Sequence, residues 1–514
     1  MACIDLILPE KGLRRWQATI VDRLRVTGHD VAVIRTGSGS TSLPTLDLIL
    51  ALEGRLLSSR RCDLATVVEG PAALASPRAA ELAIDLTGAS ANRVAPTLTI
   101  AFDGSRCVST AARVLANGGL PDLSLSLDGK PVATAAPMVD SRVLLSRGLD
   151  DILARAITLV VTTAEQFVEG RLAAIVPKPI AAPAVPPTRG LAGAYLSSTL
   201  PRLVKRAARR LCYRDHHWRV GYRFVDGPGV AETGTLSGGA WSMLPEDGQR
   251  FYADPFPFAW DGRHFIFVEE LPYATGKGVI SVAEIDANGH VIGTGPVLEE
   301  PHHLSYPQVF ARDGEIWMLP EGGAGNSLIL YRAEDFPRRW TRHRTLIEGE
   351  DLFDATLLDR DGKLWLFATQ RDHGGSASDT LVVFHAESLE GPWMPHPMNP
   401  ILIDRSRARP GGAVVEIDGR IFLPVQNGTQ CYGGGLGLSK IIHLDAAMVT
   451  MAPPVGIDIR SDWPYPHIHT LNRAGRLETI DGIDESVPRP RSICRIAMAP
   501  DPAVAATAAR TVLT

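Results

Sequence analysis

The sequence lacks the patterns that mark several common classes of protein. Its 6 cysteines include no CxxC pair and no regular spacing, so free thiols are expected rather than a disulfide framework or a structural zinc site. No GxGxxG follows the first apolar segment, and no lysine-containing phosphate loop occurs in the chain. We therefore predict neither a nucleotide cofactor nor a metal.

Charge and hydropathy argue against two further properties. The formal net charge of -5 argues against nucleic acid as a partner, because phosphate binding requires a basic surface. No window reaches the ~18 apolar residues that a membrane span needs, and the first residues lack the basic segment of a signal peptide. These features predict a cytoplasmic protein, with peripheral attachment at the inner membrane face as the alternative.

What the sequence does contain is a repeat. A short apolar segment is followed by a turn pair and then by an aromatic-rich strand, and this order recurs about every fifty residues. The period predicts a propeller blade, since Asp-Gly pairs form tight turns between antiparallel strands. Five copies predict a five-bladed β-propeller over residues 215–500, with Trp218–Phe224 completing the last blade. The turn pairs begin at Asp261, Asp313, Asp361, Asp418 and Ala474.

The residues that open the repeats are polar and differ from blade to blade. Because the first strands of the blades surround the axis, we expect these residues to converge at one end of the central channel. Such variation among equivalent positions is typical of a binding funnel. The positions are Asp254, Tyr306, Asp354, Arg409 and His469, with His467 as the alternative in the last repeat.

Acidic residues at comparable places in the repeats predict chemistry on a glycosidic bond. Asp254 and Asp354 open blades one and three, and Glu321 ends the second strand of blade two. Cleavage needs one ionised and one protonated carboxyl group, and a separation of about 5 Å predicts retention whereas about 6.5–9.5 Å predicts inversion. We predict these three acids as catalytic. The alternative is that they cap turns or pair with arginines.

Further polar and aromatic residues are predicted to bind the substrate. Arg409 offers a planar set of donors to an anion or a hydroxyl group, with a salt bridge to Asp254 or Asp354 as the alternative. A single histidine without a second ligand nearby favours a hydrogen-bonding role over a metal site. The predicted substrate-binding residues are Tyr252, Glu270, Tyr306, Arg409, Tyr432 and His469.

Residues 1–175 have a different pattern from the repeats. They alternate short apolar runs with helical periods, which predicts an α/β domain with a mostly parallel, Rossmann-like sheet. The order of elements resembles the N-terminal domain of formyltransferases, but the Asn, His and Asp set of that family cannot be placed, so formyl transfer is expected to be lost. Asp85 and Asp103 each end an apolar strand, where they either line a ligand crevice or cap the following turn.

A connector is predicted over residues 176–214. Its first part is rich in proline and predicts an extended linker. Its second part, residues 200–214, places Leu200 and Val204 on one helical face and basic side chains on the other. Such a helix favours contact with an anionic membrane, with a connector packed against a domain as the alternative. Residues 501–514 are predicted to form a C-terminal tail.

Several motifs of the repeats resemble a known family. FYADPF, HLSYPQVF, MLPEG and SRARPGG occur in order and at blade spacing. They resemble the five-bladed domain of glucosamine inositolphosphorylceramide transferases and of bacterial relatives that have a formyltransferase-like N-terminal region. More distantly, the repeats resemble furanosidase-type five-bladed glycosidases, which carry an aspartate in the first blade, where Asp254 stands. Blade two opens with Tyr306 rather than an acid, so Glu321 would have to substitute.

These features together predict a carbohydrate-active protein of polysaccharide or glycolipid biosynthesis. The resemblance implies a sugar or glycolipid substrate and action on a glycosidic bond in the propeller funnel, in the manner of a glycosyltransferase or a glycosidase. A non-catalytic glycan-binding module, or a scaffold for a partner glycosyltransferase, is the alternative. Two acids with separated pKa values would favour the enzyme, whereas aromatic residues and arginines alone would favour the binding module.

Overall fold

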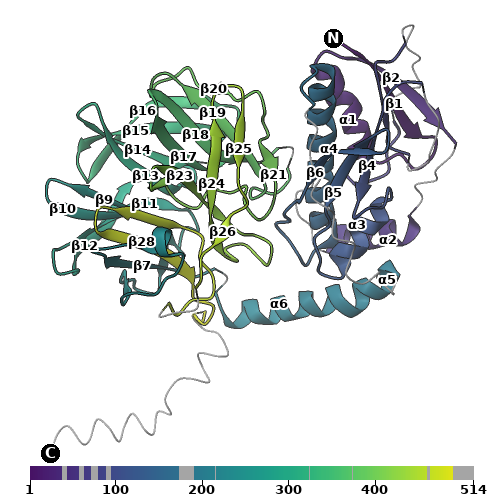
Figure 1. Ribbon diagram of the computed structural model, residues 1–514. Helices are drawn as coiled ribbons and strands as arrows, with labels where there is room; N and C mark the ends of the chain where they lie inside the picture. The colour runs from purple at the N-terminus through teal and green to yellow at the C-terminus, as the bar shows by residue number, and fades with distance from the viewer. Residues whose placement is uncertain are drawn as a thin grey trace, which may run out of the picture.

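The computed structural model shows two domains side by side, with a helical connector along their lower edge (Figure 1). It describes residues 1–37, 43–56, 63–70, 79–87, 94–172, 190–214, 216–322, 325–372, 374–459 and 463–489. The proline-rich part of the predicted linker and the predicted tail at residues 501–514 lie outside these ranges. Among the described residues, no helix is long and apolar enough to cross a bilayer.

The first domain is built on one mixed sheet with the strand order β2-β1-β3-β4-β5-β6. The first four strands of this order pair in parallel, whereas β5 is antiparallel to both of its neighbours. The strands are β1 (Cys3–Pro9), β2 (Asp30–Thr36), β3 (Leu82–Asp85), β4 (Thr97–Phe102), β5 (Leu123–Leu127) and β6 (Lys130–Ala135). The helices are α1 (Arg15–Val26), α2 (Pro44–Leu56), α3 (Val108–Ala116) and α4 (Leu145–Val168).

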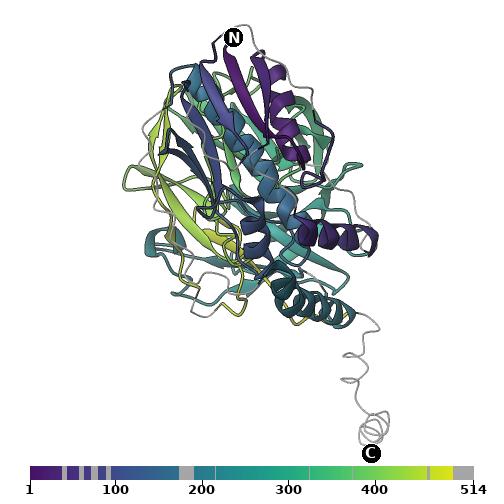
Figure 2. The ribbon, with the colours of Figure 1, turned by 90° about the vertical axis from the view of Figure 1, so that its right-hand side faces the viewer.

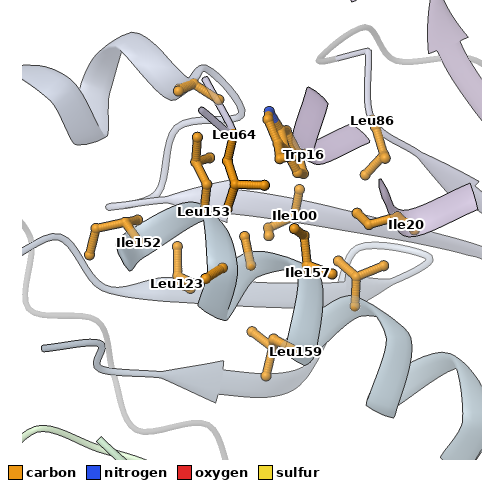
Figure 3. Packing of buried hydrophobic residues seen from close by; sticks show 14 of the residues in the cluster. Trp16, Ile20, Leu64, Leu86, Ile100, Leu123, Ile152, Leu153, Ile157 and Leu159 are labelled. Atoms are coloured by element: carbon orange, nitrogen blue, oxygen red, sulfur yellow. The ribbon is translucent and has the colours of Figure 1, made fainter. Parts of the chain in front are cut away.

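Helix α4 organises the core of this domain. It is 24 residues long and contacts α1, α2 and α3 as well as the sheet. Its side chains Ile152, Leu153 and Ile157 pack beside Trp16 and Ile100 (Figure 3), and all five are buried. Burial of each large apolar side chain contributes about 1.5–3 kcal/mol, so this contact is sufficient to fix the helix on the sheet.

The second domain is a propeller of five antiparallel sheets, which confirms the predicted number of blades. Blade one consists of β9 (Arg250–Trp260), β10 (Arg263–Pro272), β11 (Val279–Ile285) and β12 (Val291–Leu298). Blade two consists of β13 (Ser305–Arg312), β14 (Glu315–Glu321), β15 (Ser327–Asp335) and β16 (Arg339–Glu348). Blade three consists of β17 (Leu352–Arg360), β18 (Lys363–Gln370), β19 (Thr380–Ala386), β20 (Met394–Pro395) and β21 (Leu402–Ile403).

The last two blades close the ring. Blade four consists of β22 (Val415–Ile417), β23 (Arg420–Gln426), β24 (Leu436–Leu444), β25 (Val449–Met451) and β26 (Val455–Gly456). Blade five joins β27 (Leu471–Ala474) and β28 (Leu477–Ile483) to β7 (Trp218–Phe224) and β8 (Ser242–Met243). Strands β28 and β7 pair from Leu477↔Phe224 to Ile483↔Trp218, as the sequence predicts. This pairing leaves no open edge between the two ends of the repeat.

The Asp-Gly pairs form the hairpin turns inside the blades. Asp261 and Gly262 have φ of 50° and 71°, and the pairs at Asp313 and Asp361 have similar values. Two successive residues with positive φ define the tight turn that matches the right-handed twist of the flanking strands. Aspartate and glycine tolerate this conformation, which explains why the same pair recurs at the same place in the first four repeats.

Helix α4 also joins the two domains. In Figure 1 it lies between the sheet and the propeller. The Arg155 Nε atom lies 2.7 Å from Asp379 Oδ1, with both side chains fully buried, and the backbone N–H of Met138 donates to Asp379 Oδ2 at 2.8 Å. The guanidinium of Arg23, on α1, donates two hydrogen bonds of 3.1 Å to the carboxylate of Asp372. The α/β domain is therefore docked on blade three, at the end of the propeller where β18 finishes.

The connector between the domains is a continuous helical segment. It comprises α5 (Leu191–Ala194), a π-helical turn at Tyr195–Thr199 and α6 (Leu200–Cys212). Helix α6 lies along the lower edge of the molecule in two perpendicular views (Figures 1 and 2). A further short helix, α7 (Val230–Thr233), follows β7. The predicted basic helix thus exists, and it ends two residues before the predicted boundary at residue 214.

Candidate functional site at the propeller axis

Three of the predicted residues occupy equivalent, strained positions on the innermost strands. Asp254, Tyr306 and Asp354 have φ of 48°, 47° and 49°. At each of them the register between the first two strands of the blade shifts, which marks a β-bulge. Positive φ costs a non-glycine residue about 1–3 kcal/mol, so the surrounding contacts must hold these side chains in place.

Asp354 lies at the centre of the first of two polar clusters. Its carboxylate accepts hydrogen bonds from Arg409 Nε at 2.6 Å and Nη2 at 3.2 Å, and from Gln426 Nε2 at 2.6 Å. The backbone N–H of Asp354 donates to Glu321 Oε2 at 3.0 Å. All four residues are buried. The salt bridge that was the alternative for Arg409 is therefore present, with Asp354 as its partner.

The guanidinium of Arg409 is also bound on its remaining side. Its Nη1 atom lies 3.3 Å from the carbonyl oxygen of Ala377 and 3.2 Å from Ser378 Oγ. The predicted role as an anion clamp therefore needs correction, because these contacts already occupy most of the donors. We interpret Arg409 as the fixed positive charge that holds the two neighbouring acids.

The surroundings of Glu321 favour its protonated form. Burial raises its pKa well above the usual range, and the negative charge of Asp354 raises it further. Arg409 opposes this effect, but its Nη2 atom is 3.9 Å from Glu321 Oε2 and much closer to Asp354. A carboxylic acid that keeps its proton at neutral pH is suited to donate it to a leaving group.

The second cluster is a chain of two aspartates and a histidine. Asp481 Oδ2 accepts from His469 Nδ1 at 2.6 Å, and His469 Nε2 faces Asp254 Oδ1 at 3.6 Å. Thr470 Oγ1 donates to Asp254 Oδ1 at 2.8 Å. Of the two candidate histidines it is thus His469 that faces the axis, whereas His467 lies 3.7 Å from Glu485.

Asp481 is a residue that the sequence reasoning missed. Besides His469 Nδ1, its carboxylate accepts the backbone N–H groups of Asp254, His469 and Thr470, each at 3.0 Å. It thereby fixes the strand segments that carry the other members of the cluster. The available signal was an aspartate inside strand β28, next to Ile480, but the following glycine gives it the form of a turn pair.

The chain gives Asp254 and His469 unusual protonation equilibria. Burial raises the pKa of Asp254 to about 7, against the lowering effect of the His469 charge. Burial alone would lower the pKa of His469, but the charges of Asp481 and Asp254 raise it to about 9. At neutral pH the imidazolium therefore faces a carboxyl group that can gain or lose a proton.

The same three residues have the spacing of a metal site. Asp254, His469 and Asp481 each offer one ligand atom within 4.8 Å of the others. However, Asp481 already accepts four hydrogen bonds, and one of them occupies the Nδ1 atom of His469. Donors directed at the carboxylate are unfavourable for a cation in the same place. We interpret the group as a hydrogen-bonded chain.

Tyr432 lies between the two clusters. Its ring centroid is 5.3 Å from the Arg409 guanidinium carbon and 5.5 Å from the ring of His469. Trp218 stacks on His469 with centroids 3.7 Å apart. Tyr432 is partly exposed, so among the predicted tyrosines it is the one placed to contact a ligand at the axis.

Three predicted substrate-binding residues need correction. Tyr306 is fully buried, and its hydroxyl is bound to Thr356 Oγ1 at 2.9 Å and to the N–H of Gly412 at 2.7 Å. Tyr252 packs in the apolar core between blades five and one. Glu270 accepts from Ser281 Oγ at 2.6 Å and pairs with Arg250. Tyr306 and Glu270 stabilise the blades through polar groups that are bound within the protein, and Tyr252 does so through its apolar packing.

Glu269, the neighbour of Glu270, takes the place that the sequence assigned to Glu270. Successive residues of a strand point to opposite faces. The negative charge of Glu269 contributes to the raised pKa values of Asp254 and Tyr432, and its Oε1 atom lies 3.1 Å from His303 Nε2. The alternation along β10 alone could not tell which of the two glutamates faces the axis.

The acids of the α/β domain have local roles. Asp85 accepts from the backbone N–H of Thr87 at 2.9 Å and pairs with Arg106 at 2.8 Å. Asp103 accepts from the N–H of Asp122 at 2.8 Å. Asp85 thus holds the turn that follows its strand, as the capping alternative predicts, whereas Asp103 joins the end of β4 to the residue before β5.

The propeller region is similar in sequence to a known protein family. Residues 243–457 match the family model described as glucosamine inositolphosphorylceramide transferase 1, N-terminal. The transferase of this name from Oryza sativa subsp. japonica is 38% identical over 198 residues, which cover 38% of this chain and 26% of the relative. The transferase from Arabidopsis thaliana is 34% identical over 206 residues, which cover 39% of this chain and 26% of the relative. The resemblance inferred from the motifs is confirmed for this region, and the matched region spans about a quarter of the relatives' length.

Solved structures of glycoside hydrolases show weaker similarity. A thermostable family-43 glycoside hydrolase has a TM-score of 0.33 and 12% identity, covering 42% of this chain and 84% of its own. The catalytic domain of the Coprinopsis cinerea GH62 alpha-L-arabinofuranosidase has a TM-score of 0.34 and 14% identity, covering 47% and 87%. The assignment of the fold rests on the strand pairing described above.

Proposed function

We propose that the propeller binds a glycan or the headgroup of a glycolipid at its axis and acts on a glycosidic bond, by transfer or by hydrolysis. One observation carries this proposal. Burial and the charge of Asp354 raise the pKa of Glu321 well above its usual range, whereas the pKa of Asp254 is about 7 beside the imidazolium of His469. Two carboxyl groups in different protonation states are what this chemistry requires. The sequence match to the inositolphosphorylceramide transferases supports a carbohydrate substrate.

Each cluster has a distinct role in this proposal. Asp254 in its ionised form acts as base or nucleophile, and His469 stabilises that charge at 3.6 Å. Glu321 acts as the acid, and the pair of Asp354 and Arg409 holds its carboxyl group in place. Tyr432 contacts the sugar face, as partly exposed aromatic rings at such sites do.

A non-catalytic role as a glycan-binding module, or as a scaffold for a partner glycosyltransferase, is the second candidate. It is favoured by the low exposure of the acids, which is 5% for Asp254 and 8% for Glu321. It is also supported by the extent of the sequence match, which is to the N-terminal part of relatives about four times as long as the matched region. The formyltransferase-like origin of residues 1–175 and a cytoplasmic location remain predictions.

Turnover by acid variants distinguishes these candidates. The full chain is assayed with aryl pyranosides and furanosides for hydrolysis, and with UDP-sugars and inositolphosphorylceramide for transfer. We expect Asp254→Asn and Glu321→Gln to lower turnover by about 10²–10⁴-fold with the fold intact, which is the usual contribution of acid–base groups. Asp418→Asn is the matched control, because Asp418 has the same left-handed backbone (φ 50°) but is exposed.

Two other results would change the conclusion. If wild-type protein binds glycans without turnover, and both acid variants bind as well as the wild type, the binding module is the correct account. If neither turnover nor glycan binding is found with these probes, the proposed carbohydrate function is wrong.

A further inference from the structure

Helix α6 and the preceding Thr199 contact the rest of the protein through polar side chains. Arg202 Nη2 donates to the carbonyl oxygen of Ala116 at 2.6 Å, and its Nη1 donates to that of Arg142 at 3.2 Å. Thr199 Oγ1 donates to the same carbonyl of Ala116 at 3.0 Å. Near the other end of α6, Arg209 pairs with Glu485 at 3.3 Å. Charged and polar side chains thus attach this helix to both domains.

The opposite side of the helix is apolar and faces solvent. Leu196, Leu200, Val204 and Leu211 are 63%, 45%, 62% and 70% exposed. Their spacing of four, four and seven residues places them on one stripe of the helix surface. A surface helix ordinarily packs such a stripe against the core. Here the stripe faces solvent and the polar side contacts the protein. Contiguous exposed apolar side chains mark a surface that another body covers.

The charge around the stripe indicates which kind of partner covers it. Residues 191–214 contain no Asp or Glu, whereas α6 alone carries Arg202, Lys205, Arg206, Arg209 and Arg210. This positive segment stands out in a chain of net charge -5. Pairing of two copies through the stripe would bring two positive segments together, which is unfavourable. Anionic headgroups would compensate the charge, and the acyl region below them would receive the apolar side chains.

We propose that the outward stripe of α6 docks the protein in the plane of an anionic membrane surface. The helix lies at the lower edge of the molecule in both views (Figures 1 and 2), so neither domain stands between it and a flat surface there. Six residues after Cys212 the chain reaches Trp218, which stacks on His469 at the axis. Six extended residues span at most about 20 Å, so the end of the helix lies within about 20 Å of the axial site.

This geometry also bears on the substrate, a step that rests on the proposed function. A sugar carried by a lipid headgroup would be presented near the propeller axis while the lipid stays in the bilayer. The docking itself requires no catalysis and is tested separately.

Vesicle co-sedimentation of the full chain tests the docking. We expect binding to vesicles of phosphatidylglycerol and phosphatidylcholine, and little binding to phosphatidylcholine alone. The triple variant Leu200→Gln, Val204→Gln, Leu211→Gln should lose at least tenfold in affinity with an unchanged melting temperature, because its side chains are exposed. Ile292→Gln, Ile442→Gln, Val455→Gln is the matched control, since these apolar side chains of the propeller are 64%, 62% and 71% exposed.

Charge variants test the electrostatic part of the proposal. Lys205→Gln and Arg210→Gln should each weaken binding to the anionic vesicles about fivefold. Raising the salt from ~0.1 M to ~1 M shortens the Debye length from about 10 Å to about 3 Å. It should therefore weaken the binding of the wild-type protein to anionic vesicles.

Three results would overturn the proposal. The first is wild-type protein that does not bind anionic vesicles. The second is a triple variant of α6 that binds them as tightly as the propeller control. The third is a wild-type dimer in solution that the triple variant converts to a monomer while no vesicle binding is seen, which would assign the stripe to a second copy of the chain. Since none of these measurements uses turnover, failure of the docking and failure of the proposed activity remain distinguishable.

Discussion

Asp254 and Asp354 occupy equivalent positions in blades one and three, with nearly identical backbone conformation, but they have different partners. Asp354 is paired with the guanidinium of Arg409 at 2.6 Å. Asp254 faces the imidazole of His469 at 3.6 Å. A guanidinium is always charged, whereas an imidazole titrates in the physiological range. The same repeat position thus supplies a fixed ion pair in one blade and a titratable pair in another.

The difference explains how one channel can hold acids with separate tasks. The pair of Asp354 and Arg409 holds Glu321 through the backbone N–H of Asp354 and the charge of the guanidinium. The His469 pair allows Asp254 to change its protonation near neutral pH.

The largest effect is expected from Arg409→Met. Removal of the guanidinium leaves the carboxyl groups of Asp354 and Glu321 buried without their positive partner, which typically costs about 3–5 kcal/mol. Urea unfolding of the variant and of Arg420→Met, whose side chain is exposed on β23, measures the difference. A loss below about 1 kcal/mol in the free energy of unfolding would show that the pair is not a fixed structural element.

The two equivalent aspartates should respond differently to the same substitution. Asp354→Asn leaves the charge of Arg409 unpaired in a buried site, so we expect a loss of about 3 kcal/mol in the free energy of unfolding. Asp254→Asn removes a charge that burial disfavours, so at pH 8 the variant should be at least as stable as the wild type. Equal losses in urea unfolding at that pH would break the comparison.

The titratable pair predicts a pH dependence of stability. The folded-state pKa of Asp254 is raised from 3.8 to about 7, so its ionisation destabilises the fold as pH rises through that window. The pKa of His469 is raised from 6.5 to about 9, so its stabilising contribution is complete below 6.5 and is lost as pH rises through 9. The melting temperature should therefore fall between pH 7 and 9.5, more steeply in wild type than in His469→Gln. Parallel curves would contradict the assignment.

Turnover, where it is found, should follow the same groups. It should rise as Asp254 loses its proton near pH 7 and fall as His469 loses its proton near pH 9. A pH–rate profile of kcat/KM measures both limbs. A rising limb near pH 4 would assign the base to another carboxylate.

The smallest effect is expected away from the axis, at a turn that the repeat itself dictates. Gly314 has φ of 79°, so Gly314→Ala should cost about 1 kcal/mol through backbone strain alone. Gly293→Ala on β12 is the control, because that glycine lacks a positive φ and a Cβ there meets open space. A large loss at Gly314 would mean that the turns contribute more to the blades than their backbone geometry implies.

Features that depend on short stretches of chain could be read from the sequence. The Asp-Gly pairs predict the hairpins, since both residues must adopt positive φ, and five repeats predict five blades. The closure by Trp218–Phe224 followed from the missing strands of the last repeat. The amphipathic pattern of α6 was equally visible, but the pattern does not say which side faces the protein.

The sequence by itself determined the blades, their turns and the set of polar residues that open the inner strands. Only the tertiary structure decided which of those residues meet. Asp254 and Thr470 are 216 positions apart, yet they share a hydrogen bond, and Asp481 joins His469 to the same cluster. Such contacts depend on how blades pack around the axis, and period and turn chemistry carry no information about that packing. The same reason explains why the hydroxyl of Tyr306 is buried and bound between blades. It also explains why the charge of Glu269 rather than that of Glu270 affects Asp254, and why the apolar stripe of α6 faces solvent.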